Sequence, residues 1–120
     1  MATVEITKEN FEEVVQNNPF VVLDFWAEWC VPCKRFAPIF EEASERHDDI
    51  VFGKVDTEEQ PELQAAFDIR SIPTIMVIRD ATIIHQQPGM LPANLLETLI
   101  EKAREVDMAE VKEHAASHQH

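Results

Sequence analysis

A strongly apolar run leads almost directly into the only two cysteines of the chain, and this arrangement constrains the fold more than any other feature. The run, residues 20–27, is rich in β-branched and aromatic side chains and predicts a strand buried on both faces. Three residues later, Cys-Val-Pro-Cys at residues 30–33 is expected to begin a helix, since proline is tolerated in a first helical turn. The sequence therefore predicts a strand–turn–helix unit with two thiols at the helix start.

Two cysteines in this position favour thiol–disulfide exchange. Cys30 would face unpaired backbone N–H groups and the positive end of the helix dipole, which stabilise the nucleophilic thiolate. Cys33 follows one turn later on the same side of the helix, close enough to form a disulfide with Cys30. We expect Cys30 to attack a client disulfide and Cys33 to resolve the mixed disulfide. The alternatives are half of a zinc site, which needs two further ligands, and a purely structural disulfide, which stabilises little across so short a loop.

The rest of the chain alternates between strand-like and helix-like segments and predicts one α/β domain. Three strands joined by helices should be mutually parallel, and a hairpin and a last helix should complete a mixed sheet of about five strands in three layers. The hairpin turn is Asp80-Ala81, and because alanine suits a positive φ poorly, either the turn differs from the usual form or some strain is tolerated. Strands are expected at residues 3–6, 20–27, 50–56, 74–79 and 82–87, and helices at 8–17 after a Thr7 cap, 31–47, 61–67 and from about 92.

Two motifs and their spacing identify a family. Asp-Phe-Trp-Ala-Glu-Trp-Cys-x-Pro-Cys-Lys at residues 24–34 is followed roughly forty residues later by Ile-Pro-Thr at residues 72–74. Over roughly residues 4–104, this order of motifs and elements resembles thioredoxin. The resemblance implies a thioredoxin fold and a protein-disulfide reductase with no bound cofactor. Its implied partners are disulfide-containing client proteins and a thioredoxin reductase, an NADPH-dependent flavoprotein that supplies the electrons. The protein itself is expected to be a monomer.

Asp24 interrupts the apolar run. A carboxylate that is buried without a partner is costly, and its raised pKa suits a general acid or base. By resemblance, Asp24 takes the proton of Cys33, Lys54 lies near this carboxylate, and the bond before Pro73 is cis and faces the cysteines. From the residues alone, a solvent-facing Asp24 and an ordinary surface Lys54 remain open alternatives.

An apolar rim is expected around the sulfur atoms, where the backbone before Pro73 would pair with an extended client segment. Val31 departs from the family, which typically has glycine there. A β-branched residue would stiffen the loop, and it either alters redox poise or client range or is a tolerated substitution with a small effect, the outcome we favour. Plain core packing is the alternative for Ile72 and Met90. By resemblance, the rim residues are Trp29, Val31, Pro32, Ile72, Gly89 and Met90.

Charge and length narrow the function further. The chain of 120 residues has a formal net charge of −13, which disfavours nucleic acid and anionic membrane surfaces as partners. The first residues carry neither a basic nor an apolar signal-peptide region, so we expect a reducing, cytoplasmic location. Residues 1–105 are expected to form the domain, and 106–120 to extend the last helix or to form a flexible tail. The tail contains histidines 114, 118 and 120. Their spacing could bind a metal weakly, but we favour a solvated, frayed tail.

Two further functions remain open at this stage. One is a thioredoxin-fold binding or chaperone-like module in which the cysteine pair is silent. The other is an oxidant or isomerase of the same fold with a shifted redox poise.

Overall fold

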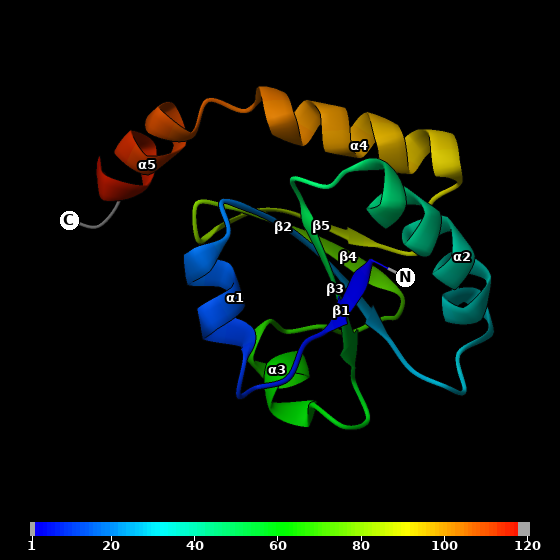
Figure 1. The fold of residues 1–120 in the computed structure, drawn as a ribbon. Helices are drawn as coiled ribbons and strands as arrows, with labels where there is room; N and C mark the ends of the chain where they lie inside the picture. The colour runs from blue at the N-terminus through cyan, green and yellow to red at the C-terminus, as the bar shows by residue number, and fades with distance from the viewer. Residues whose placement is uncertain (1, 118–120) are drawn as a thin grey trace.

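Five strands form one mixed sheet in the order β1-β3-β2-β4-β5 (Figure 1). The structure is a computed structural model and describes residues 2–117. β1, β3 and β2 are mutually parallel, whereas β4 runs antiparallel to β2 and β5 antiparallel to β4, as the sequence predicts. The strands are β1 (Thr3–Glu5), β2 (Phe20–Trp26), β3 (Val51–Asp56), β4 (Thr74–Arg79) and β5 (Thr82–Pro88). The helices are α1 (Phe11–Asn17), α2 (Val31–Arg46), α3 (Pro61–Ala66), α4 (Ala93–Glu105) and α5 (Met108–Ser117).

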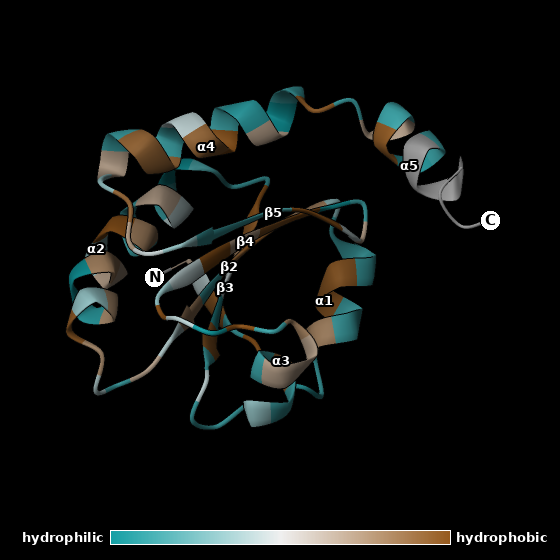
Figure 2. Ribbon diagram, turned by 180° about the vertical axis from the view of Figure 1, so that it is seen from behind, coloured by the Kyte–Doolittle hydropathy of each residue, from teal (hydrophilic) through white to brown (hydrophobic). Residues whose placement is uncertain are grey.

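Helices cover both faces of the sheet, so the central strand β2 is buried on both sides. Alternate side chains of a strand point to opposite faces. Phe20 and Val22 accordingly pack toward α2 and α4, and Val21 and Leu23 pack toward α1 and α3. Figure 2 shows apolar residues on the inward faces and polar residues on the outward faces of these helices. The predicted three-layer α/β thioredoxin fold is confirmed.

The first helix begins later than the sequence pattern indicates. α1 starts at Phe11 rather than at residue 8. Thr7 and Asn10 exchange hydrogen bonds: the Thr7 N–H donates to Asn10 Oδ1 at 2.8 Å, and the Asn10 N–H donates to Thr7 Oγ1 at 3.3 Å. These two bonds have the reciprocal pattern of a capping box, and the Phe11 N–H donates to the Thr7 carbonyl at 2.9 Å, so the expected Thr7 cap is present on a turn that leads into α1.

The β4–β5 turn keeps a left-handed backbone without glycine. Asp80 has φ +50° and Ala81 has φ +61°, the φ pattern of a type I′ hairpin turn. Alanine in this region carries a steric cost of about 1–2 kcal/mol. Of the two outcomes that the sequence left open, the fold therefore has the tolerated strain and not a different turn.

The C-terminal segment, for which the sequence left open a continued last helix or a flexible tail, forms a separate helix up to Ser117. α4 ends at Glu105, because Val106 is extended and Asp107 starts a new helix by accepting a hydrogen bond from the Glu110 N–H at 3.1 Å. α5 then packs near the β4–β5 turn, with Met108 buried and Lys112 3.3 Å from Asp80. His118 and His120, and the side chain of His114, lie outside what the structure describes. None of the helices within residues 2–117 combines the length and the apolar character needed to cross a bilayer.

Candidate active site

The two cysteines lie at the start of α2 and form a disulfide. Cys30 is the N-cap residue, and its sulfur accepts a hydrogen bond from the Cys33 N–H at 3.2 Å. The two Cα atoms are 5.2 Å apart. Cys30 is 4% exposed and Cys33 is 2% exposed. The helix start therefore directs an N–H group at Cys30, as expected for a sulfur that must carry negative charge.

The bond between Ile72 and Pro73 is cis and lies beside the disulfide. The Ile72 carbonyl oxygen is 3.7 Å from Cys30 Sγ, although 42 residues separate them in sequence. Ile72 also packs against the buried cluster that contains both cysteines. The Gly89 N–H donates to the Pro73 carbonyl at 2.8 Å, which places a third segment at the site.

The side chains around the disulfide form an exposed apolar rim. Trp29 is 68% exposed and Val31 is 58% exposed. Pro32, Gly89 and Met90 are also exposed, and Ile72 is half-buried. Gly89 has φ +89°, and no atom lies within 4 Å of where its Cβ would be. Glycine is therefore needed there for its backbone conformation, and the space in front of it stays open.

Asp24 is fully buried on the face of β2 that α2 covers. Its exposed fraction is 0%, and neither carboxylate oxygen has a hydrogen-bond partner within residues 2–117. Burial raises the pKa of the Asp24 carboxyl from 3.8 to about 7, and the positive charge of Lys54 opposes part of this rise. The structure thus excludes the solvent-facing alternative for Asp24.

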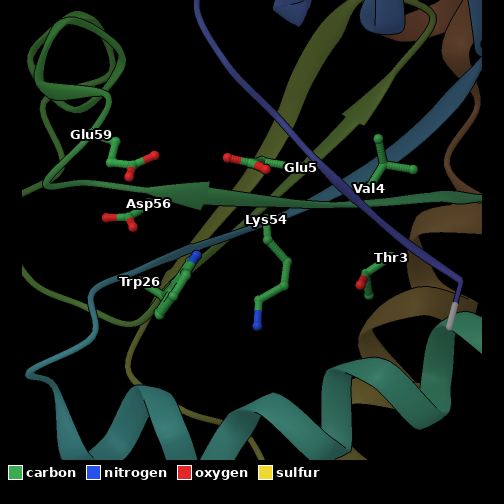
Figure 3. Close-up of a pocket in the computed structure, with 7 residues that line it drawn as sticks. All are labelled: Thr3, Val4, Glu5, Trp26, Lys54, Asp56 and Glu59. Atoms are coloured by element: carbon green, nitrogen blue, oxygen red, sulfur yellow. The ribbon is translucent and has the colours of Figure 1, made fainter.

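Lys54 is the register neighbour of Asp24 on the adjacent parallel strand, so both side chains project from the same face of the sheet. Its ammonium lies over the ring of Trp26, with Nζ 4.8 Å from the ring centroid. Both line a groove of about 380 Å³ that opens at the β1 edge (Figure 3). Lys54 is therefore only partly exposed and is not an ordinary surface lysine.

Two residues near the site escaped the sequence reasoning. Trp26 belongs to the motif but had no assigned role; its spacing of two residues from Asp24 already places both on one face of a strand. Glu58 accepts a hydrogen bond from Trp29 Nε1 at 2.6 Å and ties the rim to the loop after β3. No local pattern indicates this contact, because it joins two loops 29 residues apart.

The other polar residues near the site do not form a metal centre. Among the described residues, 2–117, no group of three or more histidine, cysteine, aspartate or glutamate side chains is arranged to hold a metal ion. The zinc alternative for the cysteine pair therefore has no support in this part of the chain.

A three-layer fold with a disulfide at a helix start and a cis-proline beside it defines the class of thioredoxin-fold thiol–disulfide oxidoreductases. The thioredoxin family model matches residues 2–102, and the chain belongs to the thioredoxin family. The Streptomyces coelicolor protein named "Putative thioredoxin 2" is 54% identical over 118 residues, which are 98% of this chain and 88% of that protein. Thioredoxin from Alicyclobacillus acidocaldarius is 38% identical over 97 residues, 80% of this chain and 92% of that protein.

Solved structures agree with this family assignment. Plasmodium falciparum thioredoxin superposes with a TM-score of 0.77 at 37% identity, covering 82% of this chain and 96% of that one. A mutant thioredoxin from Halobacterium salinarum gives a TM-score of 0.81 at 27% identity, covering 88% and 93%. The protein is thus a protein thiol–disulfide oxidoreductase whose reactive pair is the only pair of cysteines in the chain.

Proposed function

We propose that the chain reduces disulfides of client proteins, with Cys30 as the attacking thiol and Cys33 as the resolving thiol. The observation that carries this assignment is the position of Cys30 as N-cap of α2, where its sulfur accepts a backbone N–H. A thiolate there is stabilised by the helix start, whereas Cys33 lies deeper, one turn along the helix.

The reaction would proceed by two exchanges that balance electrons. The Cys30 thiolate attacks one sulfur of the client disulfide, and the other client sulfur leaves as a thiolate. The Cys33 thiolate then attacks Cys30 Sγ and releases the second client thiolate. The client gains two electrons, and the protein is left with the Cys30–Cys33 disulfide found in this structure.

Asp24 is proposed as the group that takes the Cys33 proton, through an intervening water, during the second exchange. A carboxyl whose pKa is near 7 loses and gains protons readily in the neutral range. Lys54 would favour the charged form of Asp24 from the neighbouring strand.

Client binding is proposed at the rim of Trp29, Val31, Pro32, Ile72, Gly89 and Met90. The backbone before Pro73 would pair with an extended client segment, because the Ile72 carbonyl already lies 3.7 Å from the attacking sulfur. The open space in front of Gly89 would let the client backbone approach closely.

The proposed setting follows from the family and from the need for a continuous electron supply. We infer that an NADPH-dependent flavoprotein, a thioredoxin reductase, restores the dithiol, and that the protein works as a cytoplasmic monomer without a bound cofactor. Residues 1–105 would form the catalytic domain, and residues 106–120 an appendage. In support, α5 lies at the opposite end of the sheet from the start of α2 (Figure 1).

Mixed-disulfide trapping tests the roles of the two cysteines. Cys33→Ser should accumulate covalent adducts with client proteins through Cys30, because the resolving thiol is gone. Cys30→Ser should accumulate almost none, because Cys33 lies inside the first turn of α2 and lacks the N-cap position that stabilises a thiolate. Equal trapping by the two variants would overturn the assignment.

A second measurement tests the direction of the reaction. If the protein is a reductant, equilibration of the Cys30–Cys33 couple with glutathione should give a reduction potential well below that of glutathione. A potential above that of glutathione would instead indicate an oxidant or isomerase. Failure to reduce insulin disulfides would favour a binding or chaperone-like module.

A further inference from the structure

Lys54 is the register neighbour of the buried Asp24, yet the two side chains do not form an ion pair. The ion pairs among residues 2–117 do not include Lys54, and both oxygens of Asp24 are without a hydrogen-bond partner. The ammonium lies instead over the face of Trp26, 4.8 Å from the ring centroid. This distance is within the range of a cation–π interaction.

Trp26 contacts both Lys54 and the buried cluster that contains the two cysteines. It follows Asp24 by two residues on β2, so its side chain leaves the same face of the sheet. Its ring also packs against the buried cluster that contains Cys30 and Cys33. The same side chain therefore joins the disulfide to the lysine that faces Asp24.

Carboxylates line the same groove as Lys54. A lysine side chain has four flexible bonds, and its ammonium moves readily toward nearby carboxylates. The groove is lined by acidic side chains from β1, β3 and the loop after β3 (Figure 3). The Thr3 hydroxyl also donates to a further carboxylate, on α2, at 3.2 Å. These acidic residues are Glu5 on β1, Asp56 on β3, Glu59 after β3 and Glu41 on α2. Without a fixed contact, Lys54 would spend time near these carboxylates.

We propose that Trp26 is a positioning residue whose ring holds the Lys54 ammonium within electrostatic range of Asp24, so that Asp24 exchanges protons with Cys33 in the neutral pH range. This inference rests on the proposed proton-transfer role of Asp24. It adds that the ring contact, and not the mere presence of Lys54, sets how strongly the lysine acts on the carboxylate.

The electrostatic sign gives the expected effect of losing the ring. The charge of Lys54 lowers the pKa of Asp24, which burial raises to about 7. If Lys54 moves toward the carboxylates that line the groove, its charge lowers the pKa of Asp24 less. The pKa of Asp24 in a variant without the ring should therefore be higher than in the parent protein.

The test is an NMR titration of the Asp24 carboxyl carbon in the oxidised protein, in which the disulfide removes thiol titration. Trp26→Leu should raise the pKa of Asp24 by about 0.5 unit, because part of the lowering that the Lys54 charge exerts is lost. Trp26→Phe keeps an aromatic face and should raise it less. Lys54→Met should raise it at least as much as Trp26→Leu.

A double variant separates positioning from changed burial. Adding Trp26→Leu to Lys54→Met should give no further rise, because the lysine through which the ring acts is already gone. Trp29→Leu removes an equally large ring that hydrogen-bonds to Glu58 instead, and should leave the titration of Asp24 unchanged. A full rise in the Lys54→Met background, or no rise in Trp26→Leu, would overturn the proposal.

The pH profile of disulfide reduction keeps the two proposals distinguishable. If Asp24 carries the proton, Trp26→Leu should shift the profile to higher pH by the same amount as the NMR titration. If the NMR pKa rises while the profile stays in place, the positioning of Lys54 stands and the proton-transfer role of Asp24 fails.

Discussion

Replacing Asp24 by asparagine should stabilise the protein in a strongly pH-dependent way. Burial raises the pKa of Asp24 from 3.8 to about 7, a difference of about three pH units. Each unit corresponds to about 1.4 kcal/mol between the two protonation states, so holding the charged form in the folded protein costs about 4 kcal/mol. Asparagine keeps the shape of the side chain and carries no charge at any pH.

The sign of the pH dependence follows from which state binds the proton. Below about pH 4, Asp24 is neutral in both the folded and the unfolded chain, and the charge costs nothing. Between about pH 4 and pH 7 the unfolded chain loses this proton first, so the free energy of unfolding of the parent falls relative to the variant. Above about pH 7 both states are ionised and the difference is constant.

The assay is equilibrium urea unfolding of the oxidised protein at several pH values between 4 and 8, followed by the fluorescence of its two tryptophans. The variant should match the parent within about 1 kcal/mol at pH 4 and exceed it by about 3–4 kcal/mol at pH 8. Asp48→Asn, at an exposed position, is the matched control and should show little change at either pH. A stability gain of Asp24→Asn that is the same at pH 4 and pH 8 would refute the reasoning.

Three further predictions concern the rim, the turn and the sheet. Val31→Gly uncovers one side of Cys30 and should speed reduction of bulky protein disulfides while sparing a small disulfide; equal changes with both substrates would mean that Val31 acts through redox potential. Ala81→Gly removes the cost of a non-glycine residue at φ +61° and should stabilise the fold by about 0.5–1 kcal/mol, and a lower thermal midpoint would contradict the left-handed turn. Gly53→Ala would place a Cβ 2.5 Å from Ile6 Cγ1 and 2.8 Å from Leu23 Cδ2, and should destabilise the protein by about 1–3 kcal/mol in urea unfolding. Unchanged stability of that variant would show that β1 can shift away from the sheet.

The order and type of the main elements could be predicted because each depends on short-range pattern. The apolar run at residues 20–27 indicates a doubly covered strand, and helices α2 and α3 begin and end within one residue of their expected positions. The helix break at Val106, which the sequence pattern does not indicate, has a local cause: Asp107 caps a new helix within an otherwise uninterrupted helical pattern.

The sequence by itself determined the reactive pair and its place at a helix start, since these follow from residue spacing and hydrophobic pattern, whereas the full burial of Asp24 was decided by the fold. Only the tertiary structure decided the contacts at and around that pair: the Ile72 carbonyl beside Cys30, the Glu58 contact to Trp29, and Lys54 over the ring of Trp26. The physical reason is register. Which residues of two strands or loops lie opposite each other depends on packing across the whole sheet, and a shift of one residue would turn Lys54 to the other face.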